Sequence, residues 1–266
     1  MLIAQLTDLH VRPRGMLANR VVETNAMLER ALHHVAALDP KPDAVIISGD
    51  LVDKGLLEEY NVLAELLHRH LSMPTYMVPG NHDRREAMRE GLVDFPGIGS
   101  DPQFIQYTVD DLPLRLVMLD SIVPGAGHGE LCPKRLDFLD RALAAQPEKP
   151  TVVVLHHPPI KCGVDFMDEI NLHSADAFSA VIARHPQVER VLCGHSHRPI
   201  IKRFAGTIVQ VAPSTAHQVS LALKPGVPET LIMEPPAYLL HRWTPADGLV
   251  THQAYIGEFA GPYPFS

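Results

Sequence analysis

The chain has 266 residues, of which 46% are hydrophobic and 20% are charged, so it can bury a substantial core without covalent cross-links. Its formal net charge of −8, with no basic run, argues against binding to duplex nucleic acid. No stretch approaches the ~20 apolar residues of a membrane span, and the N-terminus lacks the basic start and long apolar region of a signal peptide. The three cysteines form neither an even framework nor a metal-binding pair, so we expect a cytoplasmic protein with reduced thiols.

Short apolar runs rich in β-branched residues alternate with amphipathic stretches along most of the chain. The predicted strands cover residues 2–6, 44–47, 75–78, 114–119, 151–155, 190–193 and 207–211. The predicted helices cover residues 23–38, 58–71, 84–90, 133–145 and 175–184. Pro133 suits the first turn of the fourth helix, and Ser174 is the expected N-cap of the fifth. This alternation of strands and helices predicts an α/β layered fold.

The pattern changes near residue 213. Five prolines make the segment 212–236 rich in loops, and two further strands are predicted at 237–243 and 248–256. The sequence has no repeat, no low-complexity tract and no linker long enough to separate two independent domains. We therefore expect one domain, with a core of residues 1–212 and C-terminal strands in 213–266. The 212–236 segment is either an arm that packs on a partner subunit or a plain surface loop.

Polar side chains follow five of the predicted strands at the point where each strand ends. In chain order they are Asp8 and His10, then Asp50, then Asn81 and His82, then His156 and His157, and finally His195 and His197. Because ligands bind beyond the carboxyl ends of strands in α/β sheets, we expect these side chains to meet in one cleft. Nitrogen and oxygen donors without a thiolate suit Mn, Fe, Zn or Co.

The spacing of these donors indicates the direction in which their side chains point. Asp8 and His10, like His195 and His197, are separated by one residue, and such residues point to the same side of an extended segment. Each motif alone also fits a turn or a buried histidine, but their ordered repetition favours a metal site. Two Asp, one Asn and at least four His give seven or more donors, which suit two ions about 3.5–4 Å apart that share a carboxylate and act on a phosphorus centre. The glycines before Asp50, Asn81 and His195 would let the backbone turn sharply.

A family resemblance rests on these residues. The ordered set D-L-H, G-D, G-N-H-D, H-H and G-H-S-H, which spans Asp8 to His197, resembles the calcineurin-like metallophosphoesterases. The stretches PDAVIISGDLVDKGLLEEY, LHHPP, RVLCGHSHRP and PSTAHQV are similar to the class III cyclic-nucleotide phosphodiesterases and the related bacterial glycerophosphodiesterases. The resemblance implies a four-layer αββα sandwich with a small C-terminal extension of strands and loops. It also makes residues 1–212 the catalytic core.

The resemblance further implies a role for each motif residue. By position, it assigns Asp8, His10 and His197 to a first metal ion, Asn81, His156 and His195 to a second, and Asp50 to both. His82 would stand beside the leaving-group oxygen as the catalytic acid without binding metal. The implied activity is hydrolysis of small phosphodiesters by attack of a metal-bound hydroxide on phosphorus. The favoured substrates are 3′,5′-cyclic nucleotides such as cAMP. The alternative is a glycerophosphodiesterase or broad-specificity phosphodiesterase, and the remote alternative is a non-catalytic scaffold.

Other residues near the motifs have more open interpretations. His217 follows a predicted strand and is a candidate for substrate contact. Arg14 is a second candidate, with a solvated surface arginine as its alternative. Asp53 and the loop 164–173 are expected to line the mouth of the cleft. Among the neighbours of the motif residues, we expect His157 to make a supporting hydrogen bond and Asp83 either to orient His82 or to cap a helix.

The expected partners are a small phosphodiester substrate and a second copy of the chain. A homodimer or larger assembly follows from the resemblance together with the proline-rich segment 212–236. Neither a membrane nor a nucleic-acid duplex is an expected partner.

Overall fold

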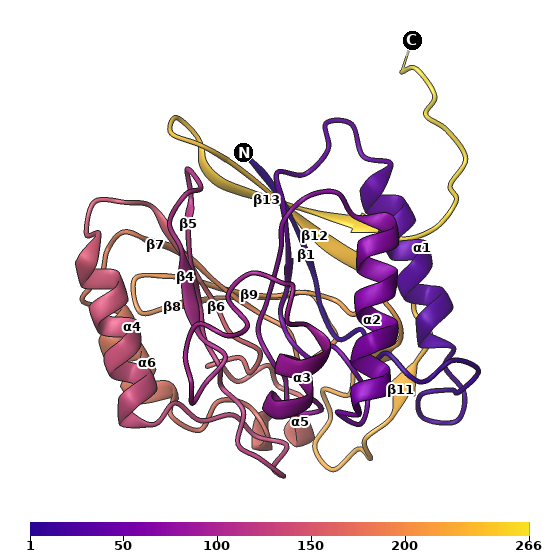
Figure 1. Cartoon of the computed structure of the whole chain (residues 1–266), viewed down its shortest axis with the longest axis horizontal. Coiled ribbons are helices and arrows are strands. Elements are labelled where there is room, and N and C mark those ends of the chain that lie inside the picture. Colours follow the sequence, from indigo (N-terminus) through magenta and orange to yellow (C-terminus); the bar gives the residue numbers. More distant parts are fainter. Residues whose placement is uncertain (266) are drawn as a thin grey trace.

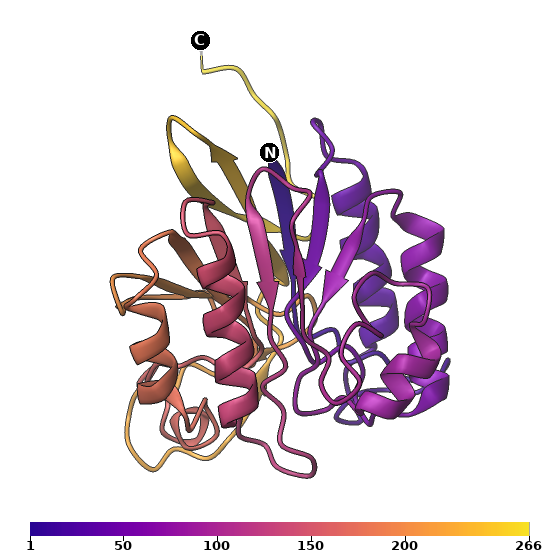
Figure 2. The same cartoon turned by 60° about the vertical axis from the view of Figure 1, so that its left-hand side comes forward.

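The computed structural model describes residues 1–265 and contains two β-sheets packed face to face. In Figure 2 helices stand on either side of the molecule and the two sheets lie between them. This arrangement confirms the predicted four-layer αββα sandwich. Because helices cover the outer face of each sheet, the strands are buried on both faces and read as continuous apolar runs in the sequence.

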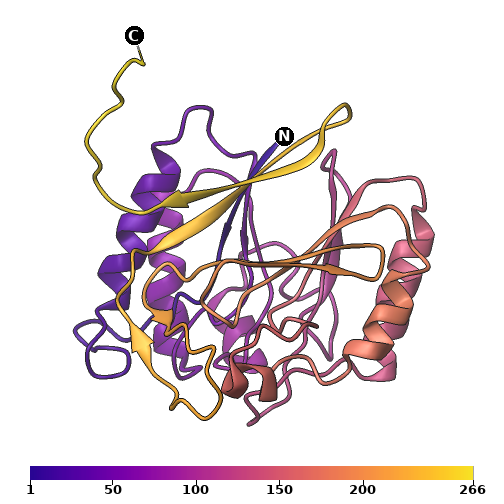
Figure 3. The ribbon, with the colours of Figure 1, turned by 180° about the vertical axis from the view of Figure 1, so that it is seen from behind.

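The first sheet is mixed, with strand order β13-β12-β1-β2-β3. Its strands are β1 (Leu2–Leu6), β2 (Ala44–Ile47), β3 (Thr75–Met77), β12 (Ala237–Thr244) and β13 (Gly248–Tyr255). β1, β2 and β3 run parallel, whereas β12 runs antiparallel to β1. Three helices pack around its outer face: α1 (Thr24–Ala36), α2 (Leu57–His70) and α3 (Arg85–Gly91). The C-terminal hairpin β12–β13 therefore extends the sheet that begins at the N-terminus, and it crosses the side of the molecule that faces the reader in Figure 3.

The second sheet has strand order β4-β5-β6-β7-β9-β8. Its strands are β4 (Tyr107–Val109), β5 (Arg115–Met118), β6 (Thr151–Val154), β7 (Val188–Cys193), β8 (Ile200–Phe204) and β9 (Thr207–Val211). The four central strands are parallel, and the edge strands β4 and β8 are antiparallel to their neighbours. The helices α4 (Pro133–Ala145) and α6 (Ala175–Ile182) cover its outer face, and the short α5 (Asp165–Glu169) lies in the connection after β6.

Side chains alternate between the two faces of each strand, as the pleat requires. On β1, Ile3 faces the second sheet, whereas Ala4 and Leu6 face the helices. On β2, Ile46 faces inward and Ile47 faces the helices. The hydrophobic core therefore has three layers, one between the sheets and one beneath each set of helices.

The ends of the sandwich differ. In Figure 1, α3, α5 and β11 lie at the lower end, opposite the N-terminus. The parallel strands finish at this lower end, so the loops after their carboxyl ends gather there. The strands β10 (Gln218–Val219) and β11 (Leu231–Ile232) pair antiparallel in the same region and frame the exposed loop between them.

Several elements differ from the sequence prediction. The strands β4 and β8 and the helix α5 were not predicted, because β4 has three residues and α5 has five, too few to show a period. β8 is an edge strand in which Ile200 and Phe204 pack on the core while Ile201 is 66% exposed, so its sequence is not a continuous apolar run. Pro133 does begin α4, as predicted. Ser174 does stand at the N-cap of α6, as predicted, but its Oγ accepts a hydrogen bond from the Leu131 amide and makes none to the helix.

The described residues, 1–265, include no helix with the length and apolar character that crossing a membrane requires.

Candidate metal centre

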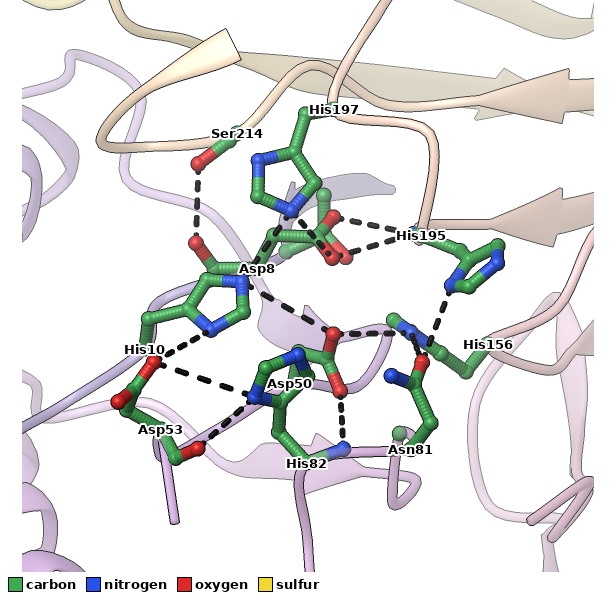
Figure 4. A network of polar contacts seen from close by, with 12 residues as sticks. Asp8, His10, Asp50, Asp53, Asn81, His82, His156, His195, His197 and Ser214 are labelled. Carbon is green, nitrogen blue, oxygen red and sulfur yellow. Dashed lines mark hydrogen bonds and ion pairs between the residues drawn. The ribbon is translucent and has the colours of Figure 1, made fainter. Parts of the chain in front are cut away.

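Side chains from both sheets meet at the lower end of the molecule, as Figure 4 shows. They are Asp8 and His10 after β1, Asp50 after β2, Asn81 and His82 after β3, His156 after β6, and His195 and His197 after β7. The structure therefore brings together all eight motif residues that the resemblance assigned to metal binding or catalysis. All of them except Asn81 and His82 are at most 6% exposed.

One half of the cluster centres on two imidazoles. The Nε2 atoms of His10 and His197 lie 3.2 Å apart. His197 Nε2 is also 3.3 Å from Asp8 Oδ1, and His10 Nε2 is 3.8 Å from Asp50 Oδ2. These four residues form one of the groups whose donor atoms are close enough to share an ion.

The other half of the cluster lies on the opposite side of Asp50. Here His156 Nε2 is 3.3 Å from Asp50 Oδ2 and 3.2 Å from Asn81 Oδ1. His195 Nδ1 is 3.0 Å from the same Asn81 oxygen. The Asp50 carboxylate consequently faces nitrogen donors of both halves, which is the position expected of a bridging ligand (Figure 4).

Backbone carbonyls fix the orientation of two of these imidazoles. His156 Nδ1 donates to the Ser48 carbonyl, and His197 Nδ1 donates to the His217 carbonyl, each at 2.8 Å. Because a carbonyl can only accept, a hydrogen sits on Nδ1, and Nε2 is the ring nitrogen that faces the cluster. Histidines that bind metal are commonly held in this way.

The buried charges of the cluster fit cations. Among the ion pairs of residues 1–265, none joins Asp8 or Asp50 to a Lys or Arg, although both carboxylates are buried. Burial raises the pKa of Asp8, but the imidazoles of His197 and His156 outweigh it and lower that pKa to about 2. Burial lowers the pKa of His156, but the two carboxylates outweigh it and raise that pKa to about 9. Buried carboxylates that have imidazoles but no Lys or Arg as ion-pair partners suit divalent ions.

The backbone at the ligand positions is left-handed. Asp8, His10, Asp50, His195 and His197 have φ values of 53°, 47°, 47°, 71° and 48°. The extended geometry predicted for the two one-residue-spaced pairs is therefore wrong, and their side chains converge because the backbone turns at each ligand. A non-glycine residue in a sparsely populated conformation costs about 1–3 kcal/mol, and such residues cluster at functional sites.

The glycines at the strand ends serve two purposes. Gly49 has φ of +98°, so it turns the backbone as predicted. Gly80 and Gly194 do not have positive φ, and their role is to allow close approach. A Cβ on Gly80 would lie 2.3 Å from the Asp50 amide nitrogen, and one on Gly194 would lie 2.0 Å from Thr7 Oγ1. Any side chain at these positions would push the loops that hold the ligands apart.

His82 stands at the edge of the cluster with its side chain 35% exposed. Its Nδ1 donates to the Asp53 carbonyl at 2.8 Å, and its backbone amide donates to Asp50 Oδ1 at 2.9 Å. The ring therefore has Nε2 free for a substrate, as a catalytic acid requires.

The structure places Asp53 behind His10, away from the pocket wall where we expected it. Its carboxylate is 4% exposed, lies 3.6 Å from His10 Nδ1 and pairs with Arg12 at 3.2 Å. Its surroundings therefore suit support of His10 better than contact with a substrate.

Asp83 has neither of the two predicted roles. Its carboxylate accepts hydrogen bonds from the amides of Leu51 and Gly80 and from the hydroxyl of Tyr60. The N-cap of α3 is Arg84. Burial, reinforced by the charge of Asp50, raises the pKa of Asp83 to about 7. Asp83 joins the ends of β2 and β3 beneath the cluster.

A pocket of about 320 Å³ opens onto the cluster. His217 lines it, with its ring nitrogen Nε2 3.4 Å from Asn19 Nδ2. Met167 and Ile170 line it too, so the predicted loop 164–173 does reach the mouth. The opposite rim is formed by residues around β10 and β11, namely Val219, Glu229, Thr230 and Leu231.

Arg14 and Asn19 show the limits of the sequence prediction. Arg14 pairs with Glu65 at 2.6 Å, is largely exposed and does not line the pocket at the cluster. We therefore do not retain it as a substrate contact. Asn19, which does line the pocket, was missed because an amide in an irregular loop carries no periodic signal.

His157 lies beside the cluster but has both ring nitrogens occupied. Ser121 Oγ is 2.8 Å from Nδ1, and the Gly127 carbonyl is 3.2 Å from Nε2. This arrangement agrees with the supporting role expected for His157.

Comparison with known proteins agrees with this geometry. The profile of the calcineurin-like phosphoesterase family matches residues 1–199. The chain belongs to that family. It is 36% identical over 266 residues to the protein named "Probable glycerophosphodiester phosphodiesterase GpdQ" of Arcobacter nitrofigilis, covering 100% of this chain and 97% of that one. It is 32% identical over 217 residues to "3′,5′-cyclic adenosine monophosphate phosphodiesterase CpdA" of Pseudomonas aeruginosa, covering 82% and 77%.

A solved structure shows the same fold. The dimetal phosphatase from Danio rerio superposes with a TM-score of 0.64 at 13% identity, covering 97% of this chain and 99% of that chain. With the family established, the chain is a metal-dependent phosphodiesterase, and the scaffold alternative is set aside.

Proposed function

We propose that the cluster holds two divalent ions and that the chain uses them to hydrolyse small phosphodiesters. Asp8, His10 and His197 would hold the first ion, Asn81, His156 and His195 the second, and Asp50 both. The supporting observation is that Asp50 Oδ2 lies 3.8 Å from His10 Nε2 and 3.3 Å from His156 Nε2. The imidazole, carboxylate and amide donors suit Mn, Fe, Zn or Co.

When bound, the ions would activate water and offset the charge that develops on the phosphate oxygens. A water oxygen bonds to phosphorus as the bond to the leaving oxygen breaks, which yields a phosphomonoester and an alcohol. His82 Nε2 gives its proton to the leaving oxygen and recovers one from solvent, while the attacking water releases one. The Asp53 carbonyl, 2.8 Å from His82 Nδ1, accepts a hydrogen bond from that nitrogen and holds the ring in orientation.

The pocket walls suggest how a substrate is held. His217 and Asn19 lie on one side of the cluster and would contact the phosphoryl oxygens or the alcohol group. Met167 and Ile170, from the loop 164–173, would contact the apolar part of the leaving group. This loop is therefore a proposed specificity element.

Among these diesters we place glycerophosphodiesters ahead of cyclic nucleotides. Within residues 1–265, no Phe, Tyr or Trp lines the pocket at the cluster, so it offers no aromatic face on which a nucleobase would stack. The similarity to a probable glycerophosphodiester phosphodiesterase extends over the whole chain. Hydrolysis of cAMP, the substrate first favoured from the sequence, is the second candidate, and the similarity to CpdA supports it.

A turnover assay with added Mn²⁺ tests this proposal. The substrates are glycerophosphoethanolamine, cAMP, bis(p-nitrophenyl) phosphate and the monoester p-nitrophenyl phosphate. We expect the diesters to be hydrolysed faster than the monoester, glycerophosphoethanolamine faster than cAMP, and Asn81→Ala to lose activity on all of them. A preference for the monoester, or full activity of Asn81→Ala, would contradict the assigned chemistry. Faster hydrolysis of cAMP would reverse the order of substrates only.

We also propose that the chain forms a homodimer through the arm at 212–236. Leu221, Leu223 and Met233 are 58%, 62% and 55% exposed, which is unusual for large apolar side chains on one short segment. The double variant Leu221→Ser/Leu223→Ser should elute as a monomer, whereas Val93→Ser, at a 72% exposed apolar site outside the arm, should elute as wild type. Identical elution of both variants would contradict the proposal.

The free cysteines support a cytoplasmic location.

A further inference from the structure

Gln5 is a fully buried polar residue between the two sheets. It lies on β1 two residues after Ile3, so the pleat directs both side chains toward the second sheet. The surrounding core is apolar, and an amide buried there costs free energy unless its polar atoms are paired. Its role in the mechanism described above is unassigned.

All hydrogen bonds of the Gln5 side chain reach across the structure. Nε2 donates to Ser48 Oγ at 2.9 Å and to the Cys193 carbonyl at 3.0 Å. Oε1 accepts a hydrogen bond from His241 Nε2 at 3.0 Å. One amide therefore connects β1 with the end of β2 in its own sheet, with the end of β7 in the other sheet, and with β12.

Two of these partners stand at the base of the ligand loops. Ser48 precedes Asp50 by two residues, and Cys193 precedes His195 by two residues. The Ser48 carbonyl also accepts the hydrogen bond that orients His156. A shift of the Gln5 amide would consequently move Asp50 relative to His195, that is, one half of the cluster relative to the other.

The far side of the Gln5 amide is held by the C-terminal hairpin. His241 Nδ1 is 2.9 Å from Thr251 Oγ1, and Arg190 Nη1 donates to the same hydroxyl at 3.2 Å. Arg190 Nη2 also donates to the Leu249 carbonyl at 3.0 Å. This chain of hydrogen bonds leaves the Gln5 side chain little freedom to rotate, because both ends of its amide are fixed.

We propose that Gln5 is a positioning residue that sets the separation of Asp50 from His195 and thereby the affinity of the centre for its two ions. The inference rests on the metal centre proposed above. Outer groups that orient metal ligands typically change metal affinity by about 10-fold to 100-fold when they are removed. Gln5 acts through two ligand loops at once, so we expect a change in that range.

The test is the Mn²⁺ affinity of Gln5→Leu, measured without substrate from the electron paramagnetic resonance signal of the free ion. We expect it to weaken about 10-fold to 100-fold, with kcat falling and KM for the diester nearly unchanged. The matched control is Gln106→Leu, which removes another buried amide, one that donates to Asp101 and not to a ligand loop. The control should bind Mn²⁺ as wild type does.

A second variant keeps the test decisive if Gln5→Leu does not fold. Ser48→Ala removes only the hydroxyl that accepts from Gln5 Nε2 and leaves the Cys193 contact in place. It should weaken Mn²⁺ binding by a smaller factor than Gln5→Leu. Unchanged binding in a folded Gln5→Leu, or in Ser48→Ala if Gln5→Leu does not fold, would overturn the inference, as would equal weakening in Gln106→Leu. If the wild type itself bound no Mn²⁺, the proposed metal centre would fail instead.

Discussion

The two sheets contribute different chemistry to the site. Loops after the first sheet supply every oxygen donor of the proposed centre, namely Asp8, Asp50 and Asn81, and a single imidazole, His10. Loops after the second sheet supply only imidazoles, those of His156, His195 and His197. Neither sheet by itself offers a complete set of ligands for two ions. The site exists only where the sheets pack together, so binding of metal and association of the two sheets are expected to stabilise each other.

Several polar links join the two sheets. The first is the ligand cluster itself, the second is the ion pair of Arg85 with Asp120, and the third is the Gln5 amide, which donates to the Cys193 carbonyl and is held by His241. A fourth is the Tyr107 hydroxyl, which hydrogen-bonds to the backbone of Met77, and an apolar layer also lies between the sheets. Because these links act at different places, substitutions can break them one at a time.

The largest effect is expected from Asp50→Asn, which alters the one carboxylate assigned to both proposed ions. The variant removes negative charge beside His10 and His156, so both ions should bind more weakly. With several kcal/mol of transition-state stabilisation lost, kcat/KM should fall by about 10⁴-fold or more. Metal analysis after dialysis should give less than the wild-type content. Wild-type content together with wild-type kcat/KM would show that Asp50 is not shared.

His82→Ala should separate catalysis from metal binding. His82 contacts the first sheet only, through the Asp53 carbonyl and Asp50 Oδ1, and its Nε2 is free. Loss of a general acid lowers kcat by about 10²-fold to 10⁴-fold. Metal content should stay at the wild-type value. A parallel loss of both would assign His82 to the metal site, and a diester with a good leaving group, such as bis(p-nitrophenyl) phosphate, should suffer least.

Asp120→Asn tests the second link. Asp120 is fully buried after β5 and accepts two hydrogen bonds from Arg85 of α3, at 2.6 and 2.8 Å. Arg85 thus ties α3, which packs on the first sheet, to the loop that follows β5 of the second sheet. Breaking a buried pair costs about 3–5 kcal/mol, because the remaining charge stays buried. Urea unfolding in EDTA should show this loss, whereas Asp137→Asn, which carries an exposed pair with Arg141, should change stability little. A loss below about 1 kcal/mol would show that Arg85 finds water instead.

The sequence predicted the long elements of the fold and the proposed ligands, but not the shortest elements. The central strands and the longer helices were predictable, because apolar runs buried on both faces and amphipathic helices of ten or more residues have clear periods. The proposed metal ligands could be picked out because each follows such a strand. The short edge strands and α5 were not predictable, since three to five residues cannot establish a period.

The geometry around the ligands was beyond the sequence. The backbone at Asp8 and His197 is left-handed, whereas the spacing predicted an extended backbone. The prediction that the paired side chains point to one cluster was correct, but the extended geometry from which it was argued was not. Asp53 and Asp83 both lie near His82 in the sequence or in space, yet one supports His10 and the other joins two strand ends. Gln5 gave no signal either, because one polar residue in a buried strand reads as an exception to the pattern.

The smallest effect should come from the third link and depends on pH. Burial, reinforced by the charge of Arg190, lowers the pKa of His241 in the folded protein to about 3, against about 6.5 in the unfolded chain. Between these values the unfolded state binds a proton that the folded state does not. Stability therefore falls as the pH drops below about 6.5, and it is unaffected by this group at neutral pH.

At pH 4.5 this loss amounts to about 3 kcal/mol. His241→Gln keeps an amide that can donate to Gln5 but cannot take up a proton, so it should lack this part of the acid sensitivity. We would measure the free energy of unfolding of both proteins in EDTA at pH 7 and pH 4.5. The cluster titrates equally in both and cancels in the difference between them. Because His241 sits where the C-terminal hairpin meets β1, equal acid sensitivity of the two proteins would mean that water reaches His241 in the folded protein and that burial does not oppose its protonation.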